Sequence, residues 1–301
     1  PPPPPPPPPH PPPTHFFNDT ATTEIYTQVN SSAASVVYKR QVLQQAIGRQ
    51  MLERLDTVRV DPRIVLDIGC GTGEITEALL QRYPKAQIVA LDFAMPMLER
   101  ASRRGRWLRR PRCLCADLDY LPLADQSVDL VFANAALQWS ARPAETFADI
   151  GRVLRPGGLV IFSSFGPDTL RELRAAWAEV DGRSHVHDFI DMHDYGDMMM
   201  RAGLADPVMD VERMTLTYAD AMQLMREIKL IGGANAQRER QRGMLGRRRL
   251  AAVCEAYEQF RDADGRLPCS YEVVHGHAWG PAQRRVAGET RVSLDTLQRK
   301  R

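Results

Sequence analysis

The stretch from Val65 to Gly73 constrains what this chain can fold into more than any other. An apolar run, Ile64 to Ile68, contains one acid and then breaks into three glycines at alternate positions, and a helix-like pattern follows over 74–82. A buried strand that turns tightly into a helix is how a nucleotide-binding α/β unit begins. Glycine is needed in such a turn because the backbone adopts φ values closed to other residues and a ligand lies against the main chain.

The glycine spacing separates two classes of ligand. A dinucleotide fingerprint reads G-x-G-x-x-G, and its third glycine lets the helix N-terminus hold a pyrophosphate. Here the pattern is Asp-x-Gly-x-Gly-x-Gly, and Glu74 stands where that third glycine would fall. An acid at a helix start repels phosphate but suits a cationic ligand. The loop resembles motif I of the S-adenosylmethionine (SAM)-dependent methyltransferases, whose ligand carries a sulfonium and an ammonium group.

Three later strand ends carry residues that complete this pattern. Asp92 ends the predicted strand 87–91, where such folds hold ribose hydroxyls. Asp117 and Leu118 follow a short strand over 113–116, and in methyltransferases this position binds the adenine ring. Asn134 ends the strand 127–133, which faces the glycine loop. The residues predicted to bind SAM are therefore Asp67, Gly69, Cys70, Gly71, Gly73, Asp92, Phe93, Met97, Asp117, Leu118 and Asn134.

Strands and helices alternate from residue 64 to 164, which predicts an α/β fold with a doubly wound, Rossmann-like sheet. We divide the chain into a disordered or artefactual proline-rich tail (1–28), a helical segment (29–60), a SAM-binding core (61–165), the remaining core strands with a helical substrate cap inserted near the C-terminus (166–281), and a flexible tail (282–301). A turn at Pro156–Gly158 is predicted to lead into a strand at Leu159.

Composition narrows the class of protein. Of 301 residues, 44% are hydrophobic and 25% charged, with a net charge of +2, which argues against a dedicated nucleic-acid binder. No apolar stretch is long enough to span a membrane, and no secretory signal is visible. The five cysteines form no C-x-x-C pair, so a metal site is not expected, and Cys113 and Cys115 are predicted to be buried thiols. A cytoplasmic monomer is expected.

The second half of the chain must define the methyl acceptor, because SAM motifs are shared by methyltransferases of every substrate class. Helices are predicted over about 165–180, 194–202, 218–231 and 245–260, and strands over 206–214 and 271–278. Two of these helices fall between the last two strands. An insertion of that size can form a cap over the SAM pocket.

Several motifs in this half resemble the malonyl-acyl-carrier-protein O-methyltransferase family of biotin synthesis. They are Ser164–Leu170 with Glu172 and Leu173, His185, Gly203 before Asp206–Asp210, Leu216–Tyr218, Met225 and Arg226 with Gly232 and Asn235, Gly246 and Arg247, and Tyr271–Val273 followed by His277–Pro281. The similarity runs from about Ser35 to Pro281. It departs at the N-terminus, where Tyr38 nearly occupies the place of a family tyrosine.

The resemblance implies transfer of the SAM methyl group to the free carboxylate of a malonyl thioester, as a primer for pimeloyl synthesis. A carboxylate with a pKa near 4 is already a nucleophile at neutral pH, so no general acid or base is predicted, only alignment. The predicted substrate-binding residues are Tyr38, Gln138, Trp139, Phe165, His185, Arg226 and Lys229. Arg226 and Lys229 share one face of a helix, and a solvated face is the alternative for that pair.

The partner implied is an acyl carrier protein bearing malonyl-phosphopantetheine. Such carriers are acidic, and the arginines from 238 to 249 form a basic run in which Arg247, Arg248 and Arg249 begin a helix. We predict that these three dock the carrier. Two other functions stay open: a complex I assembly-factor-like protein-arginine hydroxylase, and a small-molecule carboxyl methyltransferase of the trans-aconitate type.

Overall fold

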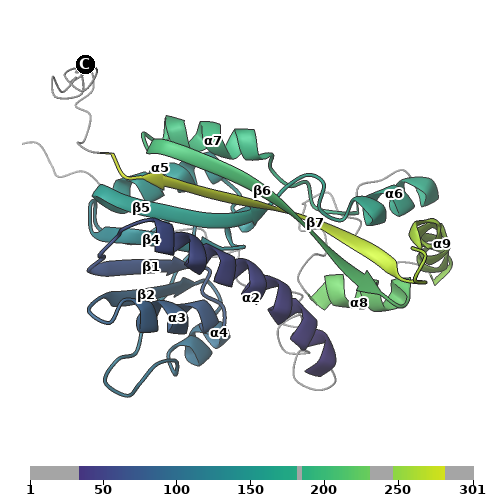
Figure 1. Cartoon of the computed structure of the whole chain (residues 1–301), viewed down its shortest axis with the longest axis horizontal. Helices are drawn as coiled ribbons and strands as arrows, with labels where there is room; N and C mark the ends of the chain where they lie inside the picture. Colours follow the sequence, from purple (N-terminus) through teal and green to yellow (C-terminus); the bar gives the residue numbers. More distant parts are fainter. Residues whose placement is uncertain (1–33, 182–184, 231–246, 282–301) are drawn as a thin grey trace, which may run out of the picture.

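The computed structural model describes residues 34–181, 185–230 and 247–281 of the chain, which form one mixed sheet covered by helices (Figure 1). The sheet has seven strands in the order β3-β2-β1-β4-β5-β7-β6. Six strands run in the same direction, and only β7, between β5 and β6, runs antiparallel to its neighbours among the described strands. The strands are β1 (Ile64–Ile68), β2 (Gln87–Asp92), β3 (Arg112–Cys115), β4 (Val128–Asn134), β5 (Leu154–Phe165), β6 (Ala205–Tyr218) and β7 (Leu267–Trp279).

Helices cover both faces of the sheet, because the parallel strands are apolar on both sides. Val65 and Ile88 pack against α2 (Ala34–Thr57) and α3 (Glu74–Arg82), and Ala90 packs against α4 (Met95–Ala101). Leu66 and Val89 point to the opposite face, where α5 (Pro143–Val153) and α7 (Met192–Arg201) lie. The predicted Rossmann-like α/β fold is confirmed.

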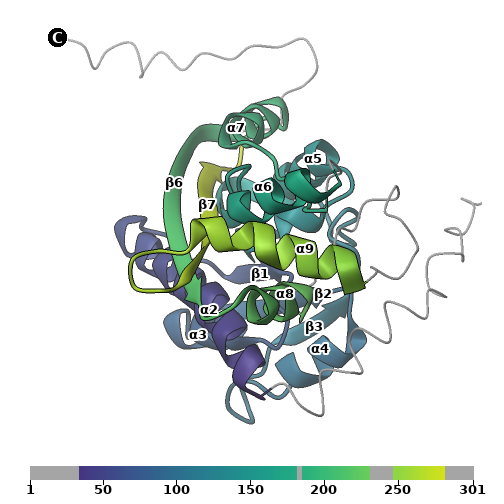
Figure 2. The ribbon, with the colours of Figure 1, turned by 90° about the vertical axis from the view of Figure 1, so that its right-hand side faces the viewer.

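The last two strands are long and carry the cap. β6 and β7 pair from Ala205 and Trp279 to Tyr218 and Leu267, and their far end extends beyond the parallel strands (Figure 1). α8 (Ala221–Leu230) and α9 (Arg247–Tyr257) follow β6 at that end, a short 3₁₀ turn (η4, Glu258–Phe260) leads into β7, and α6 (Arg171–Val180) lies beside α9 (Figure 2). The predicted insertion of two helices between the last two strands is therefore present.

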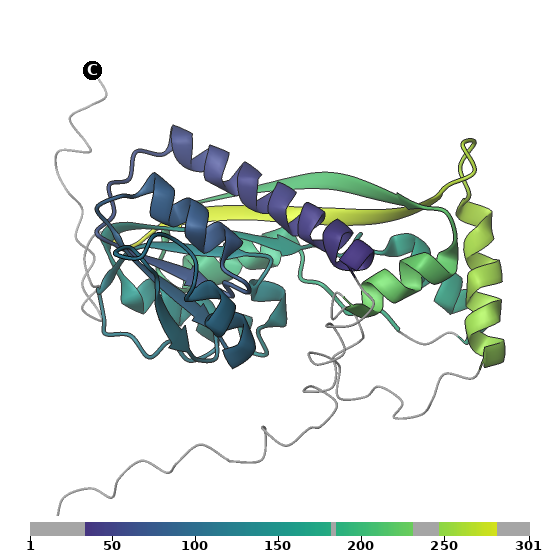
Figure 3. The same cartoon turned by 90° about the horizontal axis from the view of Figure 1, so that it is seen from below.

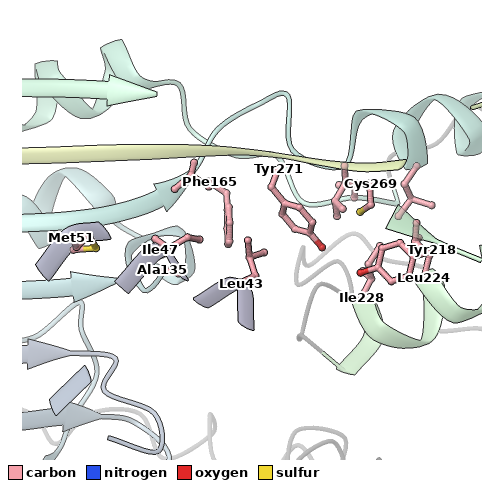
Figure 4. Packing of buried hydrophobic residues seen from close by; sticks show 14 of the residues in the cluster. Leu43, Ile47, Met51, Ala135, Phe165, Tyr218, Leu224, Ile228, Cys269 and Tyr271 are labelled. Atoms are coloured by element: carbon pink, nitrogen blue, oxygen red, sulfur yellow. The ribbon is translucent and has the colours of Figure 1, made fainter. Parts of the chain in front are cut away.

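One hydrophobic cluster joins the core to the cap. Ile47 and Met51 of α2 lie under the sheet, Leu43 and Phe165 continue the row, and Leu224 of α8 closes it at the cap end (Figure 4). Helix α2 runs along the sheet towards this end (Figure 3). The cap thus shares one hydrophobic core with the glycine-loop half of the protein, which we define as residues 61–164. In the described part of the chain, no helix is long and apolar enough to cross a membrane.

Three local predictions are wrong. The helix predicted from about residue 165 begins only at Arg171, because Phe165 is the last residue of β5 and a turn follows it. The strand β5 begins at Leu154, and the Pro156–Gly158 stretch lies inside it as a bulge, since Val128 pairs with Leu154 but Leu130 pairs with Leu159. Gly157 at φ 74° allows this irregularity. Cys113 and Cys115 are exposed, because β3 is the edge strand of the sheet and both of its faces are poorly covered.

Candidate functional site

The glycine loop is held at the carboxyl end of β1 by the neighbouring strand. Gly69, Gly71 and Gly73 have φ values of 68°, 54° and 79°, which side chains disfavour. The amides of Gly69 and Cys70 donate to the Leu91 carbonyl at 2.8 and 3.0 Å. A Cβ atom on Gly69 would lie 2.6 Å from the Cβ of Ala136, so the loop also closes tightly on the segment after β4.

Asp92 lies against the loop with part of its hydrogen-bonding capacity used. Its Oδ2 accepts from the Gly71 amide and its Oδ1 from the Ala94 amide, both at 2.9 Å. A carboxylate offers about four acceptor sites, so each oxygen keeps one for a ligand. Asp92 can therefore accept two hydroxyl groups.

Asp67 is buried beneath the same loop. Its carboxylate accepts a hydrogen bond of 2.5 Å from the Thr76 hydroxyl. Burial raises the pKa of Asp67 to about 7, the Thr76 hydrogen bond opposes the rise, and the nearby Asp92 charge adds to it. A cationic ligand near the loop would favour the ionised form of this group.

Glu74 is paired within the protein. Its Oε2 accepts from Gln45 of α2 at 2.5 Å, and its Oε1 lies 3.7 Å from Arg104. The acid at the start of α3 thus links α2 to the donor loop. Its charge is partly compensated by Arg104.

The residues predicted to bind adenine lie at the protein surface. Phe93 is 58% exposed, and Met97 and Leu118 are half-buried. Asp117 is exposed, and its Oδ1 accepts from the Asp119 amide at 3.0 Å, which shapes the turn after β3.

Sequence reasoning missed Asp119, which is buried. It accepts from the Ser140 and Thr146 hydroxyls at 2.5 and 2.6 Å and from the Ala141 amide at 2.9 Å. These bonds fasten the turn after β3 to the segment after η3 (Leu137–Trp139).

Asn134 links three elements at the end of β4. Its Nδ2 donates to the Gln44 carbonyl of α2 at 3.0 Å, and its Oδ1 accepts from Ser163 of β5 at 3.0 Å. Both ends of the amide are therefore engaged by the protein. In this arrangement Asn134 places α2 over the loop and the pocket described next.

An apolar pocket lies between the glycine-loop half and the cap. The space between its lining residues is about 710 Å³, part of it open to solvent. Its lining comes from α2, η3, the end of β5, the turn before α6, the segment before α7, α8 and β7. The lining residues are Leu43, Gln44, Gln138, Trp139, Phe165, Thr169, Leu170, Val186, His187, Phe189, Ile228 and Tyr271.

The turn between β5 and α6 forms one wall because it is fastened to β7. The Gly166 amide donates to the Glu272 carbonyl at 2.9 Å, and the Leu170 amide donates to the Ser270 carbonyl at 2.7 Å. A Cβ atom on Gly166 would lie 2.5 Å from the Glu272 carboxylate. Glycine at this position therefore lets the turn approach β7 and bring Phe165 near Tyr271, with ring centroids 5.9 Å apart.

The structure brings three of the predicted substrate residues together. Gln138, Trp139 and Phe165 line the pocket. Gln138 is 6% exposed, and its Nε2 donates to the Ala135 carbonyl at 2.7 Å.

Two other predicted substrate residues lie elsewhere. His185 stacks on Trp177 with ring centroids 3.8 Å apart and bonds Asp181 at 2.8 Å, outside the pocket. Arg226 is exposed on α8, and Ile228 of that helix lines the pocket instead. The side chains of Tyr38, Lys229 and Arg247 lie outside the described residues; Arg248 and Arg249 are exposed on α9.

The described pocket lining contains one candidate general base, His187. Apart from His187, none of its described residues is ionisable near neutral pH. No group of three or more His, Cys, Asp or Glu side chains within the described ranges could hold a metal ion.

Comparison with known proteins identifies the family. Residues 66–162 match the model of the methyltransferase domain. The malonyl-[acyl-carrier protein] O-methyltransferase of Halorhodospira halophila is 50% identical over 265 residues, covering 86% of this chain and 90% of that protein. The enzyme of the same name from Laribacter hongkongensis is 49% identical and covers 84% and 87%.

Solved structures support the fold alone. A candidate methyltransferase from Bacillus halodurans aligns with a TM-score of 0.56 at 16% identity, covering 78% of this chain and 99% of that one. The YcgJ protein of Bacillus subtilis aligns with a TM-score of 0.55 at 16% identity, covering 77% and 98%. The fold, the glycine loop and the curated relatives agree, and the chain belongs to the malonyl-[acyl-carrier protein] O-methyltransferase family, a family of SAM-dependent methyltransferases.

Proposed function

We propose that this protein transfers the methyl group of SAM to the free carboxylate of malonyl-acyl carrier protein and so forms the methyl ester that primes pimeloyl synthesis. The observation that carries the proposal is the 50% identity to a malonyl-[acyl-carrier protein] O-methyltransferase over nearly the whole of both chains. The apolar pocket beside the glycine loop supports it, because an ionised carboxylate needs alignment rather than a base.

On the donor side, Asp92 would accept both ribose hydroxyls with its two remaining sites, and the peptide groups of Gly69 to Gly73 would lie along the methionine portion of SAM. The exposed ring of Phe93 and the side chains of Met97 and Leu118 would flank adenine, with Asp117 accepting from its amino group. Asp67 lies beneath the loop and contributes negative charge under the cation.

On the acceptor side, Gln138, Trp139 and Phe165 would surround the malonyl group at the end of the pocket nearest the donor. η3 follows β4 directly, and β4 is the neighbour of β1 in the sheet, so this end faces the glycine loop. In the reaction, a lone pair of the carboxylate forms the new O–CH₃ bond while the S–C bond breaks and its electrons stay on sulfur. No proton moves, and the charges of carboxylate and sulfonium disappear together.

The carrier would approach the cap. Arg248 and Arg249 are exposed on α9, which packs on α8 and α6 at the far end of the paired strands β6 and β7 (Figure 2). Cations there would attract the acidic carrier, and Ile228 of α8 lies in the pocket that the phosphopantetheine arm must enter. Arg226 is exposed on the same helix as Ile228, so a contact with the arm or its phosphate suits it better than a contact with the malonyl carboxylate.

The direct test is a mass-spectrometric assay with SAM and malonyl-acyl carrier protein. We expect the acyl group to gain the mass of one methyl in place of hydrogen, and esterase treatment to remove that gain. A carrier loaded with the malonamyl group, which has an amide in place of the carboxylate, is the matched control and should stay unmodified.

The alternatives give different outcomes in the same assay. If malonyl-acyl carrier protein is not methylated but a free tricarboxylate is, the protein is instead a small-molecule carboxyl methyltransferase. Arginine hydroxylation of a protein partner would produce oxygen addition without consumption of SAM methyl groups. Neither alternative is favoured by the curated relatives.

A further inference from the structure

His187 lines the pocket on the side of Trp139. Its ring centroid is 6.3 Å from that of Trp139, which belongs to η3 directly after β4, and 5.3 Å from that of Phe189. Sequence reasoning singled out His185 but passed over this residue two positions later.

The backbone around His187 is held in place by its neighbours. Val186 is buried at 2% exposure, and Nη2 of Arg174 on α6 lies 3.5 Å from the His187 carbonyl oxygen. Arg174 also donates to the carbonyls of Pro167 and Thr169, so it ties this segment to the pocket wall formed by the turn before α6. The side chain is therefore placed by its backbone.

The Nδ1 atom of His187 is buried and has no hydrogen-bond partner among the described residues. A buried polar atom without a partner costs stability, so such atoms in a pocket indicate where a ligand supplies the missing bond. Two other lining residues have such an atom. In Gln138 it is the acceptor Oε1, since Nε2 already donates to Ala135, and in Tyr271 it is the hydroxyl, which lies beside the Cys269 thiol. An acceptor oxygen does not suit a carboxylate, whereas a ring N–H does.

We infer that the Nδ1–H group of His187 donates a hydrogen bond to the malonyl carboxylate oxygen that does not attack, and so orients the oxygen that does. The inference rests on the proposed function. One N–H donor fixes the carboxylate without the bidentate charge pairing of an arginine, which would lower the nucleophilicity of both oxygens. This assigns to His187 the anchoring role that the sequence had suggested for Arg226.

Two isosteric substitutions separate the ring nitrogens. In His187→Asn the amide nitrogen can take the place of Nδ1, and in His187→Gln it reaches towards the place of Nε2. For kcat/KM with malonyl-acyl carrier protein we expect a loss of about 10- to 100-fold in His187→Leu and His187→Gln, as for a hydrogen bond to a charged group, but only a few-fold loss in His187→Asn. Binding of SAM should change less than about twofold in all three variants.

A second readout excludes a merely structural role. Butyryl-acyl carrier protein has an ethyl group in place of the carboxylate, so as a competitive inhibitor it should bind wild type and His187→Leu equally. If His187→Leu weakens butyryl and malonyl carriers alike, or if His187→Asn is as slow as His187→Leu, the assignment of Nδ1 is wrong. If the wild-type protein does not methylate malonyl-acyl carrier protein at all, the proposed function fails first, which distinguishes the two failures.

Discussion

The donor loop and the acceptor pocket are built by different kinds of structure. The loop consists of main chain held by main chain, with Gly69 and Cys70 bonded to the Leu91 carbonyl and two carboxylates beneath it. The pocket is lined by side chains from segments between Leu43 and Tyr271, and mostly apolar ones. A donor site built from backbone tolerates few substitutions, but it can serve enzymes with many different acceptors. A pocket lined by side chains can change its shape by substitution without moving the donor.

The largest effect should come from the donor side, in Asp92→Ala. The substitution removes a charged acceptor for the Gly71 and Ala94 amides and for the proposed ribose contact, each hydrogen bond to a charged group being worth about 1.5–3 kcal/mol. We expect the affinity of the donor site to fall by about 100-fold or more. Calorimetry measures it with S-adenosylhomocysteine, the demethylated form of SAM, which shares its ribose. Glu99→Ala, an exposed acid on α4, is the control, and equal binding by the two variants would remove Asp92 from the donor site.

The pocket should separate stability from acceptor binding. Phe165 is 9% exposed and packs between Phe189 and Tyr271, so Phe165→Ala should lower the free energy of unfolding by about 3 kcal/mol. Trp139 is 45% exposed, and Trp139→Ala should change that free energy by less than about 1 kcal/mol while lowering kcat/KM for malonyl-acyl carrier protein. Denaturant unfolding and steady-state kinetics measure the two. Loss of SAM affinity in Trp139→Ala would mean that the two sites are not separable.

A third comparison concerns charge beneath the donor. Because the pKa of Asp67 is about 7 when the donor is absent, binding of a cation should release a proton. We expect the affinity for SAM to fall about tenfold between pH 8 and pH 6, and Asp67→Asn to lose this part of the pH dependence. An unchanged pH profile in Asp67→Asn would show that Asp67 does not sense the donor.

The raised pKa of Asp67 also sets a sign for folding stability. The folded protein holds this proton up to about pH 7, whereas the unfolded chain loses it near the ordinary aspartate pKa of 3.8. The contribution of Asp67 therefore falls as pH rises between these values, and it falls less once SAM is bound.

The smallest effect is expected at the cap surface. Arg248→Glu and Arg249→Glu together should raise KM for malonyl-acyl carrier protein several-fold, and less for malonyl-CoA, because exposed charges act mainly on encounter. The difference should shrink at high salt. An equal rise of KM for both substrates at low salt would refute carrier docking on α9.

The sequence predicted the fold of the glycine loop and its flanking strand and helix well because the signals there are local. Three glycines in a strand-turn-helix have one common explanation, and they do adopt positive φ. The pocket could not be predicted in the same way, because its lining residues His187 and Tyr271 are 84 positions apart in the sequence. The turn 166–170, which forms the wall between them, is held by bonds to β7 that no local pattern indicates.

Arg226 shows which local signal was available in the cap. Its charge makes it a candidate for binding the substrate. However, Leu224 and Ile228 are buried four residues apart on α8, so Arg226, midway between them, lies on the other side of the helix. Periodicity would have favoured Ile228 as the pocket residue. The exposed cysteines of β3 were missed for a related reason, since alternation in a strand says nothing about whether the strand is at an edge.

Helix α2 has one consequence for the order of events. Leu43 and Gln44 line the pocket, the Gln44 carbonyl accepts from Asn134, and the next residue, Gln45, bonds Glu74 at the start of the donor helix. A shift of α2 would therefore change the proposed donor site and the pocket at the same time. By thermodynamic reciprocity, any factor by which the first substrate tightens the second must also apply in the reverse direction. Cooperative binding of donor and carrier would thus need no contact between them.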